Sequence, residues 1–343
     1  MAKLPSELES CTRATLVYDL ATIAENFSTV AAAAHRVGIR VLFAAKSFPD
    51  PRVLELAAER LDGFDVASPA ELAAVNGKII SICDPSGRTS PLRSGRTIAS
   101  IETLAQLAAV PPHAEVAIRI SASITGRDPA IGAILDGSGH RRSRFGVSDR
   151  AEVAALVEAC GRRVGLHLHH GPITATSAER FIASAHAALA LVDFEPAFLN
   201  LGGAWHGIAD LADAFAKLRE AVPRSIELLI EPGRLFAARA GFACGIVTAS
   251  RSLHDRELRV LDLSRACHLR WSPVDLVAPA PRPGHGRKVL LVGPTCYEED
   301  TIGEWTIEPS HIERRAIVRD VPGYALAWNT GFAGIPPADV IIR

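Results

Sequence analysis

The apolar and polar positions divide the chain into two parts. In the first part, short apolar runs alternate with segments in which apolar residues recur at helical spacing. The runs predict eight strands: Val41–Ala45, Gly63–Ala67, Ile79–Cys83, Thr97–Ser100, Glu115–Ile120, Val164–His169, Ala197–Leu201 and Ile226–Glu231. Strands that alternate with helices and are apolar on both faces form parallel sheets. We therefore expect an α/β protein with a closed (β/α)8 TIM barrel, and a doubly wound open sheet is the alternative.

The second part, after Arg234, shows little helical periodicity. Short β-type runs lie between turns rich in proline and glycine, at Val260–Leu263, Lys288–Val292, Ala316–Arg319 and Val340–Ile342. These runs predict a second, all-β domain, a β-barrel or sandwich. An early strand, Ala14–Tyr18, precedes the barrel and is assigned to this domain. The expected boundaries are residues 20–236 for the barrel, and residues 1–19 with 237–343 for the β domain.

Composition limits the classes of function. The chain has 343 residues, 48% hydrophobic and 22% charged, with a formal net charge of -1. This charge balance gives no reason to expect nucleic acid or a membrane surface as a partner. The start of the chain lacks the apolar core of a signal peptide, and no run is long enough to span a membrane. Six scattered cysteines without metal-ligand spacing are typical of free thiols in the cytoplasm, and we expect no metal site.

Polar residues accumulate at the C-terminal ends of the predicted strands, where barrel enzymes build their active sites. They are Lys46, Asp65, Arg119, His167, His169, Gly202, Gly203 and Glu231. Lys46 is the most informative, because an ammonium group is costly to bury and a desolvated lysine becomes a nucleophile towards aldehydes. Taken alone, Lys46 is better explained as a side chain that reaches solvent from the end of its strand, and the residues downstream reverse that preference.

Several short motifs occur in an order that resembles a known enzyme family. They are Ala44–Ser47, Phe64–Ser68 with Glu71, Ser143–Gly146, Gly165–His169, Leu199–Gly203, Glu231–Arg234, Val292–Cys296 with Asp300, and Gly323 with Tyr324. Together they resemble the fold-type III pyridoxal phosphate-dependent decarboxylases, which include the diaminopimelate, ornithine and carboxynorspermidine decarboxylases. The resemblance covers nearly the whole chain and implies an alanine racemase-like barrel with a β domain.

The resemblance implies a role for each matching residue. Lys46 would form the Schiff base with pyridoxal 5′-phosphate, and His169 would stack on the cofactor ring. Glu231 would keep the ring nitrogen protonated, which makes the ring a strong electron sink and favours decarboxylation. The remaining expected cofactor ligands are Asp65, Arg144, Gly202, Gly203, Ala204, Gly233, Arg234 and Tyr324.

The β domain would supply the other half of the chemistry. The resemblance implies that Cys296 reaches the active site of a neighbouring subunit and protonates the reaction intermediate, so we expect a homodimer with shared sites. Tyr297, Asp300 and Tyr324 are the expected substrate contacts.

The chain also departs from the family pattern. Pro172 replaces a serine that would contact phosphate, Ala204 replaces the third glycine of the glycine loop, and Tyr297 replaces the usual acidic residue after the cysteine. Phe332–Gly334 contains alanine where asparagine is usual. These changes indicate a divergent member of the family.

The predicted function is decarboxylation of a diamino acid or related polar amino acid, free or bound to a carrier. One alternative is an amino acid racemase or epimerase on the same fold. The other is a catalytically silent homologue that binds the cofactor and acts as a regulator.

Overall fold

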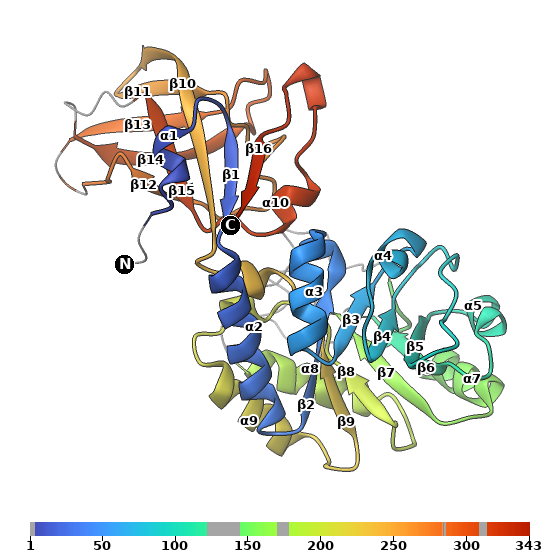
Figure 1. Cartoon of the computed structure of the whole chain (residues 1–343). Coiled ribbons are helices and arrows are strands. Elements are labelled where there is room, and N and C mark those ends of the chain that lie inside the picture. Colours follow the sequence, from blue (N-terminus) through green and yellow to red (C-terminus); the bar gives the residue numbers. More distant parts are fainter. Residues whose placement is uncertain (1–3, 122–144, 170–177, 283, 285, 309–313) are drawn as a thin grey trace. The chain divides into compact units, whose positions relative to one another are not determined.

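The computed structural model describes residues 4–121, 145–169, 178–282, 284, 286–308 and 314–343 (Figure 1). The chain forms two compact units. The barrel unit comprises Phe27–Lys46 and Asp50–Leu235, and the β unit comprises Met1–Asn26, Ser47–Pro49 and Phe236–Arg343.

The barrel unit contains a closed barrel of eight parallel strands. They are β2 (Ile39–Ala44), β3 (Gly63–Val66), β4 (Ile79–Ile82), β5 (Arg96–Ile101), β6 (Glu115–Ile120), β7 (Val164–Leu168), β8 (Phe198–Asn200) and β9 (Glu227–Ile230). The first and last strands pair, with Ile39 opposite Leu228 and Val41 opposite Ile230. This closure confirms the predicted barrel and excludes the open sheet.

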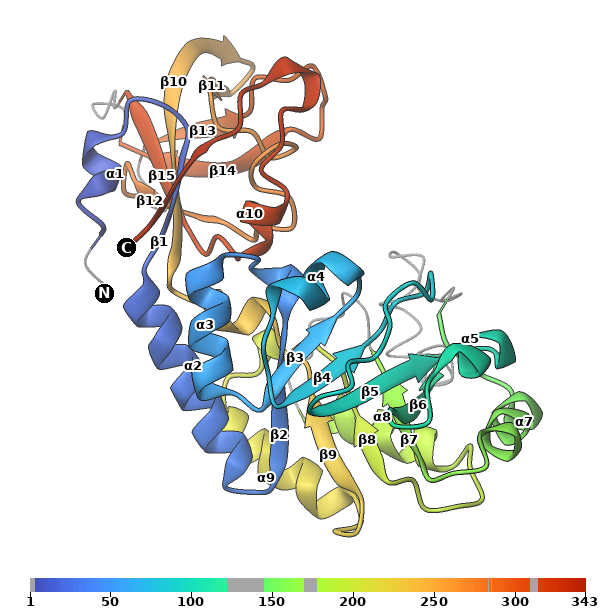
Figure 2. The same ribbon diagram turned by 45° about the vertical axis from the view of Figure 1, so that its right-hand side comes forward.

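Helices surround the barrel strands (Figure 2). They are α2 (Leu20–His35), α3 (Pro51–Arg60), α4 (Pro69–Ala74), α5 (Leu104–Ala109), α7 (Arg150–Cys160), α8 (Glu179–Leu189) and α9 (Leu211–Ala221). Asp50 caps the N-terminus of helix α3, and its side chain accepts a hydrogen bond from the backbone N–H of Arg52. Ser68 caps α4 through the backbone N–H of Glu71. These caps fix where the chain leaves the active-site end of β2 and β3.

The β unit contains an eight-stranded sheet with the order β12-β15-β10-β11-β13-β14, to which β1 adds beside β10 and β16 beside β1. Its strands are β1 (Thr15–Tyr18), β10 (Gly241–Leu253), β11 (Arg256–Leu261), β12 (Asp275–Ala278), β13 (Arg287–Val292), β14 (Thr301–Ile307), β15 (Arg315–Arg319) and β16 (Asp339–Ile342). Two short helices, α1 (Glu7–Ser10) and α10 (Tyr324–Ala327), complete the unit. The chain's first and last strands are thus parallel neighbours in one sheet.

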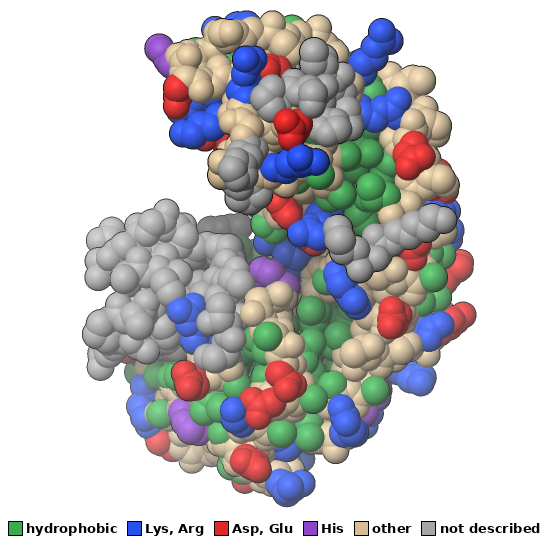
Figure 3. Space-filling view, turned by 90° about the vertical axis from the view of Figure 1, so that its left-hand side faces the viewer, with side chains coloured by type: hydrophobic (Ala, Val, Ile, Leu, Met, Phe, Trp, Pro, Cys, Tyr) green, Lys and Arg blue, Asp and Glu red, His purple; other side chains and the backbone are tan. Residues whose placement is uncertain are grey.

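The surface matches the balanced composition. Figure 3 shows basic and acidic side chains interspersed over the face that it displays. Across the ranges given above, we find no helix that combines the length and apolar character needed to cross a membrane.

Candidate active site

Lys46 lies at the C-terminal end of the barrel, immediately after β2. It belongs to the 3-10 helix η1 (Ala45–Ser47), and its ammonium group pairs with a carboxylate oxygen of Asp65 on β3. The Lys46 side chain is 37% exposed and that of Asp65 only 4%. Burial and the nearby Glu231 carboxylate raise the pKa of Asp65 to about 6, although Lys46 acts in the opposite direction. The lysine is therefore both anchored and accessible.

Glu231 follows β9 and is buried among polar side chains. One carboxylate oxygen lies 3.4 Å from Nε2 of His167 on β7, and the other accepts a hydrogen bond from the Asn200 side chain on β8. Burial alone favours the protonated acid, but the charges of His167 and Lys46 and the Asn200 hydrogen bond lower the pKa of Glu231. Glu231 is thus a buried carboxylate that stays ionised at neutral pH.

The glycine loop after β8 packs against the imidazole of His169. Gly202 has a φ of 61°, and a Cβ atom at this position would lie 2.9 Å from Cδ2 of His169. A Cβ atom on Gly203 would lie 3.4 Å from Nε2 of His169 and 3.2 Å from the carbonyl oxygen of Glu231. At Gly202 a side chain would meet both a left-handed backbone and a crowded ring, and at Gly203 it would fit only tightly. The next residue, Ala204, also has a left-handed backbone, with a φ of 75°.

The predicted phosphate ligands Gly233 and Arg234 directly follow Glu231 at the end of β9. Burial and the charge of Arg234 lower the pKa of His206, which lies in the loop after Gly203. Arg144 and Pro172 lie outside the described residues.

Sequence reasoning did not assign a role to Asn200. Its side chain is 1% exposed, donates to Glu231, and accepts a hydrogen bond of 2.9 Å from the backbone N–H of Gly202. It therefore joins the acidic residue to the glycine loop. The one available signal was an amide residue within an apolar strand, directly before two predicted ligands.

Besides Oγ of Ser47, two buried oxygen atoms at this end of the barrel have no hydrogen-bond partner among the described residues. They are Oδ1 of Asp65 and Oγ of Ser81, which occupy paired positions on β3 and β4. Native proteins rarely leave buried polar atoms unpaired, so these atoms indicate a polar ligand. Together with the Lys46 amine, the Glu231 carboxylate and the glycine loop, they fit a cofactor that carries an aldehyde, a ring nitrogen and a phosphate.

The predicted residues of the β unit gather around the loop between β13 and β14. Cys296 and Tyr297 are exposed on this loop, whereas Asp300 is 2% exposed. The Asp300 carboxylate accepts hydrogen bonds from Ser264 and Thr295, including both the side chain and the backbone N–H of Thr295. It also accepts hydrogen bonds from two further backbone N–H groups. This satisfied, buried carboxylate fixes the Cys296 loop, which argues against the predicted contact of Asp300 with substrate.

Tyr324 begins α10 and contacts Trp271 edge to face, with ring centroids 5.7 Å apart. Trp271 also contacts Trp328 at 5.3 Å, is 51% exposed and has a φ of 61°. The predicted ligand Tyr324 is therefore part of a partly exposed aromatic cluster.

The C-terminal end of this parallel barrel carries a lysine, a buried acid and a glycine loop. This arrangement is typical of the enzymes that build their active site at this end of a (β/α)8 barrel. Residues 20–238 match the family described as "Pyridoxal-dependent decarboxylase, pyridoxal binding domain". The chain therefore belongs to the pyridoxal-dependent decarboxylases, as predicted, and its cofactor is pyridoxal 5′-phosphate. As a member, it is a pyridoxal phosphate-dependent amino acid decarboxylase.

Individual relatives are distant. The diaminopimelate decarboxylase of Pseudomonas fluorescens is 26% identical over 334 residues, which cover 84% of this chain and 78% of that protein. The diaminopimelate decarboxylase of M. jannaschi has a similar fold, with a TM-score of 0.79, 19% identity, and coverage of 98% of this chain and 88% of the other. The lysine/ornithine decarboxylase of Vibrio vulnificus, complexed with putrescine, has a TM-score of 0.75, 18% identity and 99% coverage of both chains. The low identities agree with a divergent member.

Proposed function

We propose that the enzyme decarboxylates a diamino acid or a related polar amino acid, with Lys46 as the lysine that binds the cofactor. The observation that carries this proposal is the buried, ionised Glu231 in the same cluster of charges as Lys46. When bound, pyridoxal phosphate supplies an aldehyde that condenses with amines and a ring that accepts electrons. An ionised acid beside the ring nitrogen strengthens this electron sink, as loss of CO₂ requires.

The residues of the barrel unit divide the work of binding. Asp65 holds the Lys46 amine, and the neutral His169 ring provides a flat surface beside the glycine loop. The backbone N–H group of Gly203 and the guanidinium of Arg234 would hold the phosphate, and Gly202, whose own N–H donates to Asn200, would leave room for it.

The proton that replaces CO₂ on the α-carbon would come from Cys296 of a partner subunit. The exposed position of Cys296 and the rigid anchoring of its loop by Asp300 support this role. The resemblance to the family implies that this thiol serves the barrel site of a neighbouring subunit, so the proposal includes a homodimer with two shared active sites. Tyr297 and Tyr324 would contact the substrate from the same unit.

Two relatives suggest where to look for the substrate. Their names specify diaminopimelate in one case, and lysine and ornithine in the other. Diamino acids are therefore the first substrates to test. Tyr297 has no negative charge to attract a distal ammonium group, so the screen should extend to other polar amino acids and to carrier-bound ones.

The test combines a spectrum with a CO₂ assay. The purified enzyme should show a visible absorption band of lysine-bound cofactor that borohydride reduction fixes to the chain at Lys46. Lys46→Ala should lose this band and all turnover, whereas Lys217→Ala, a change at an exposed lysine on α9, should keep both. A fully active Lys46→Ala enzyme would contradict the proposal. Racemised substrate without CO₂ would favour the racemase, and a bound cofactor with neither product would favour the silent regulator.

A further inference from the structure

A second buried histidine at the active-site end has no part in the chemistry described so far. His167 lies on β7, two residues before His169, and its side chain is 1% exposed. Its Nδ1 atom lies 2.7 Å from Oγ of Ser100 on β5, and its Nε2 atom lies 3.4 Å from a carboxylate oxygen of Glu231. The imidazole therefore connects a strand on one side of the barrel to the acid that follows β9.

The two histidines of β7 have opposite electrostatic surroundings. Burial opposes a charge on His167, but the Glu231 carboxylate and the Cys83 thiol raise its pKa to about 10. Burial and the charges of His167 and Lys46 lower the pKa of His169 to about 3. At neutral pH the inner histidine is thus a cation, and the histidine against the glycine loop is neutral.

A buried carboxylate needs a nearby cation in order to stay ionised. Without a nearby cation, burial would leave Glu231 protonated at neutral pH, and a neutral acid cannot stabilise a protonated ring nitrogen. Asn200 supplies a hydrogen bond to Glu231 but no charge. Lys46 also supplies charge, but its ammonium group is paired with Asp65, and in the proposed function it would be engaged with the cofactor. His167 remains as a permanent cationic neighbour.

We propose that His167 is a positioning residue that keeps Glu231 ionised and fixes its orientation, and that Ser100 holds the imidazole in place for this task. This inference rests on the proposed function, because it gives Glu231 its partner for the cofactor ring.

Other charged and titratable groups also surround His167, and the tests must separate them from Glu231. They are Cys83 after β4, Arg119 on β6, Asp65 on β3, Lys46 after β2 and His169 after β7. Arg119 donates a hydrogen bond of 2.6 Å to Sγ of Cys83, so the thiol already has a cationic partner of its own. Among the groups that raise the pKa of His167, Glu231 has the largest effect, and Cys83 adds to it.

The first test measures the charge of His167 directly. Imidazole nitrogen NMR spectra of the full-length protein, with and without cofactor, are assigned by comparison with His167→Gln. We expect the His167 ring to keep both protons from pH 6 to pH 9. In Glu231→Gln, the pKa of His167 should fall to about 6.5, the ordinary value for histidine, or below. A neutral His167 ring at pH 7 in the wild-type protein would overturn the proposal.

The second test measures the consequence for the cofactor. His167→Gln should weaken the affinity for pyridoxal phosphate about tenfold, the effect of removing the ion-pair partner of one buried carboxylate. It should also move the pH midpoint of the visible band of the bound cofactor. Ser100→Ala should move both quantities in the same direction by a smaller factor. His186→Gln, which changes an exposed histidine on α8, should leave them unchanged.

The outcomes distinguish this inference from the proposed function. Unchanged affinity and pH midpoint in both His167→Gln and Ser100→Ala reject His167 as a positioning residue, even if the enzyme releases CO₂. Conversely, if no amino acid yields CO₂ while the NMR and affinity results are as expected, decarboxylation fails and the His167–Glu231 pair stands. If His167→Gln does not fold, Ser100→Ala still decides the question through the cofactor affinity and the pH midpoint.

Discussion

At Asn200, one side chain satisfies two requirements of the active site. Its amide group donates to Glu231 while its oxygen accepts from the backbone of Gly202. Asn200→Ala leaves both partners buried and without this bond, so we expect a loss of roughly 1–3 kcal/mol in the free energy of unfolding. Cofactor affinity should also fall, because both the acid and the glycine loop lose their support. Denaturant unfolding and cofactor titration measure the two effects.

A matched variant separates shape from charge at the same position. Asn200→Asp keeps the size of the side chain but places a second carboxylate against Glu231. We expect this variant to be less stable at pH 8 than at pH 5, because protonation of one acid relieves the repulsion. If the difference in the free energy of unfolding between Asn200→Asp and the wild type were the same at pH 5 and pH 8, the Asn200 contact with Glu231 would be unimportant.

Asp65 allows a prediction about pH. Its folded-state pKa of about 6 is above the ordinary value for an aspartate, so the folded protein binds a proton here more tightly than the unfolded chain. The contribution of Asp65 to stability is therefore greatest near pH 4 and declines as the pH rises towards 6 and above. Asp65→Asn lacks this titration, so its stability relative to the wild type should increase by roughly 2 kcal/mol between pH 4 and pH 7. Unfolding curves of both proteins across this range provide the test.

Sequence alone located some of these residues but not their partners. Lys46 and Glu231 stood out because each charged group directly follows an apolar strand. The contacts of His167 with Ser100 and Glu231 join β7 to β5 and β9, which are not sequence neighbours. Such contacts depend on how the barrel closes and on the size of the side chains inside it, and no local pattern encodes them.

Among elements, the barrel strands were predictable because they are buried on both faces. Strand β4, for example, is buried at every position, and its residues are isoleucine apart from Ser81. Strands β10, β12 and β14 of the β unit were not predicted. The second half of β10 is largely exposed and polar, and its strand conformation comes from pairing with β11, whereas β15 pairs with the buried first half. Antiparallel strands of this kind take their structure from partners rather than from local hydrophobicity.

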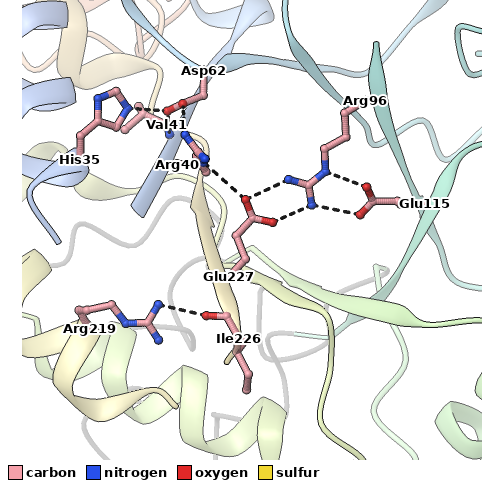
Figure 4. A network of polar contacts seen from close by, with 9 residues as sticks. All are labelled: His35, Arg40, Val41, Asp62, Arg96, Glu115, Arg219, Ile226 and Glu227. Carbon is pink, nitrogen blue, oxygen red and sulfur yellow. Dashed lines mark hydrogen bonds and ion pairs between the residues drawn. The ribbon is translucent and has the colours of Figure 1, made fainter. Parts of the chain in front are cut away.

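The opposite ends of the barrel strands also carry polar groups, but these serve stability. Arg96 at the start of β5 forms ion pairs with Glu115 at the start of β6 and Glu227 at the start of β9, at 2.8 and 2.7 Å (Figure 4). Glu227 in turn lies 3.5 Å from Arg40 on β2. The guanidinium thus connects strands that are not adjacent in the barrel.

Removing this connection should affect folding but not the cofactor. Arg96→Met leaves two partly buried carboxylates without their shared cation, so we expect a loss of roughly 1–3 kcal/mol in the free energy of unfolding. Arg96→Lys keeps the charge without the forked geometry and should lose less. Both variants should bind pyridoxal phosphate as the wild type does, because Arg96 lies at the N-terminal ends of the strands. A change in cofactor affinity would show that the two ends are coupled.

For the whole molecule, the decisive expectation is the shared active site. The barrel unit contains Lys46, and the β unit contains Cys296, the proposed proton donor from a partner subunit. If each site takes one residue from each subunit, Lys46→Ala and Cys296→Ala homodimers are both defective. Mixing the two variants under conditions that exchange subunits then creates heterodimers in which one site is intact and the other carries both changes. Half of the dimers are heterodimers at equal mixing, so roughly a quarter of the wild-type activity should return.

The result depends on geometry that no single-variant experiment can reveal. If both residues of a site came from one subunit, every site in the mixture would carry one of the two changes, and no activity would return. A double variant, Lys46→Ala with Cys296→Ala, mixed with wild-type enzyme serves as the control, because its heterodimers should have two defective sites rather than one. With shared sites, the activity of the mixture should fall to roughly half of the activity that the same amount of wild-type enzyme shows before mixing. If each site were formed within one subunit, mixing would leave the activity unchanged. The two mixtures therefore predict opposite changes, a gain in one and a loss in the other, from the same exchange of subunits.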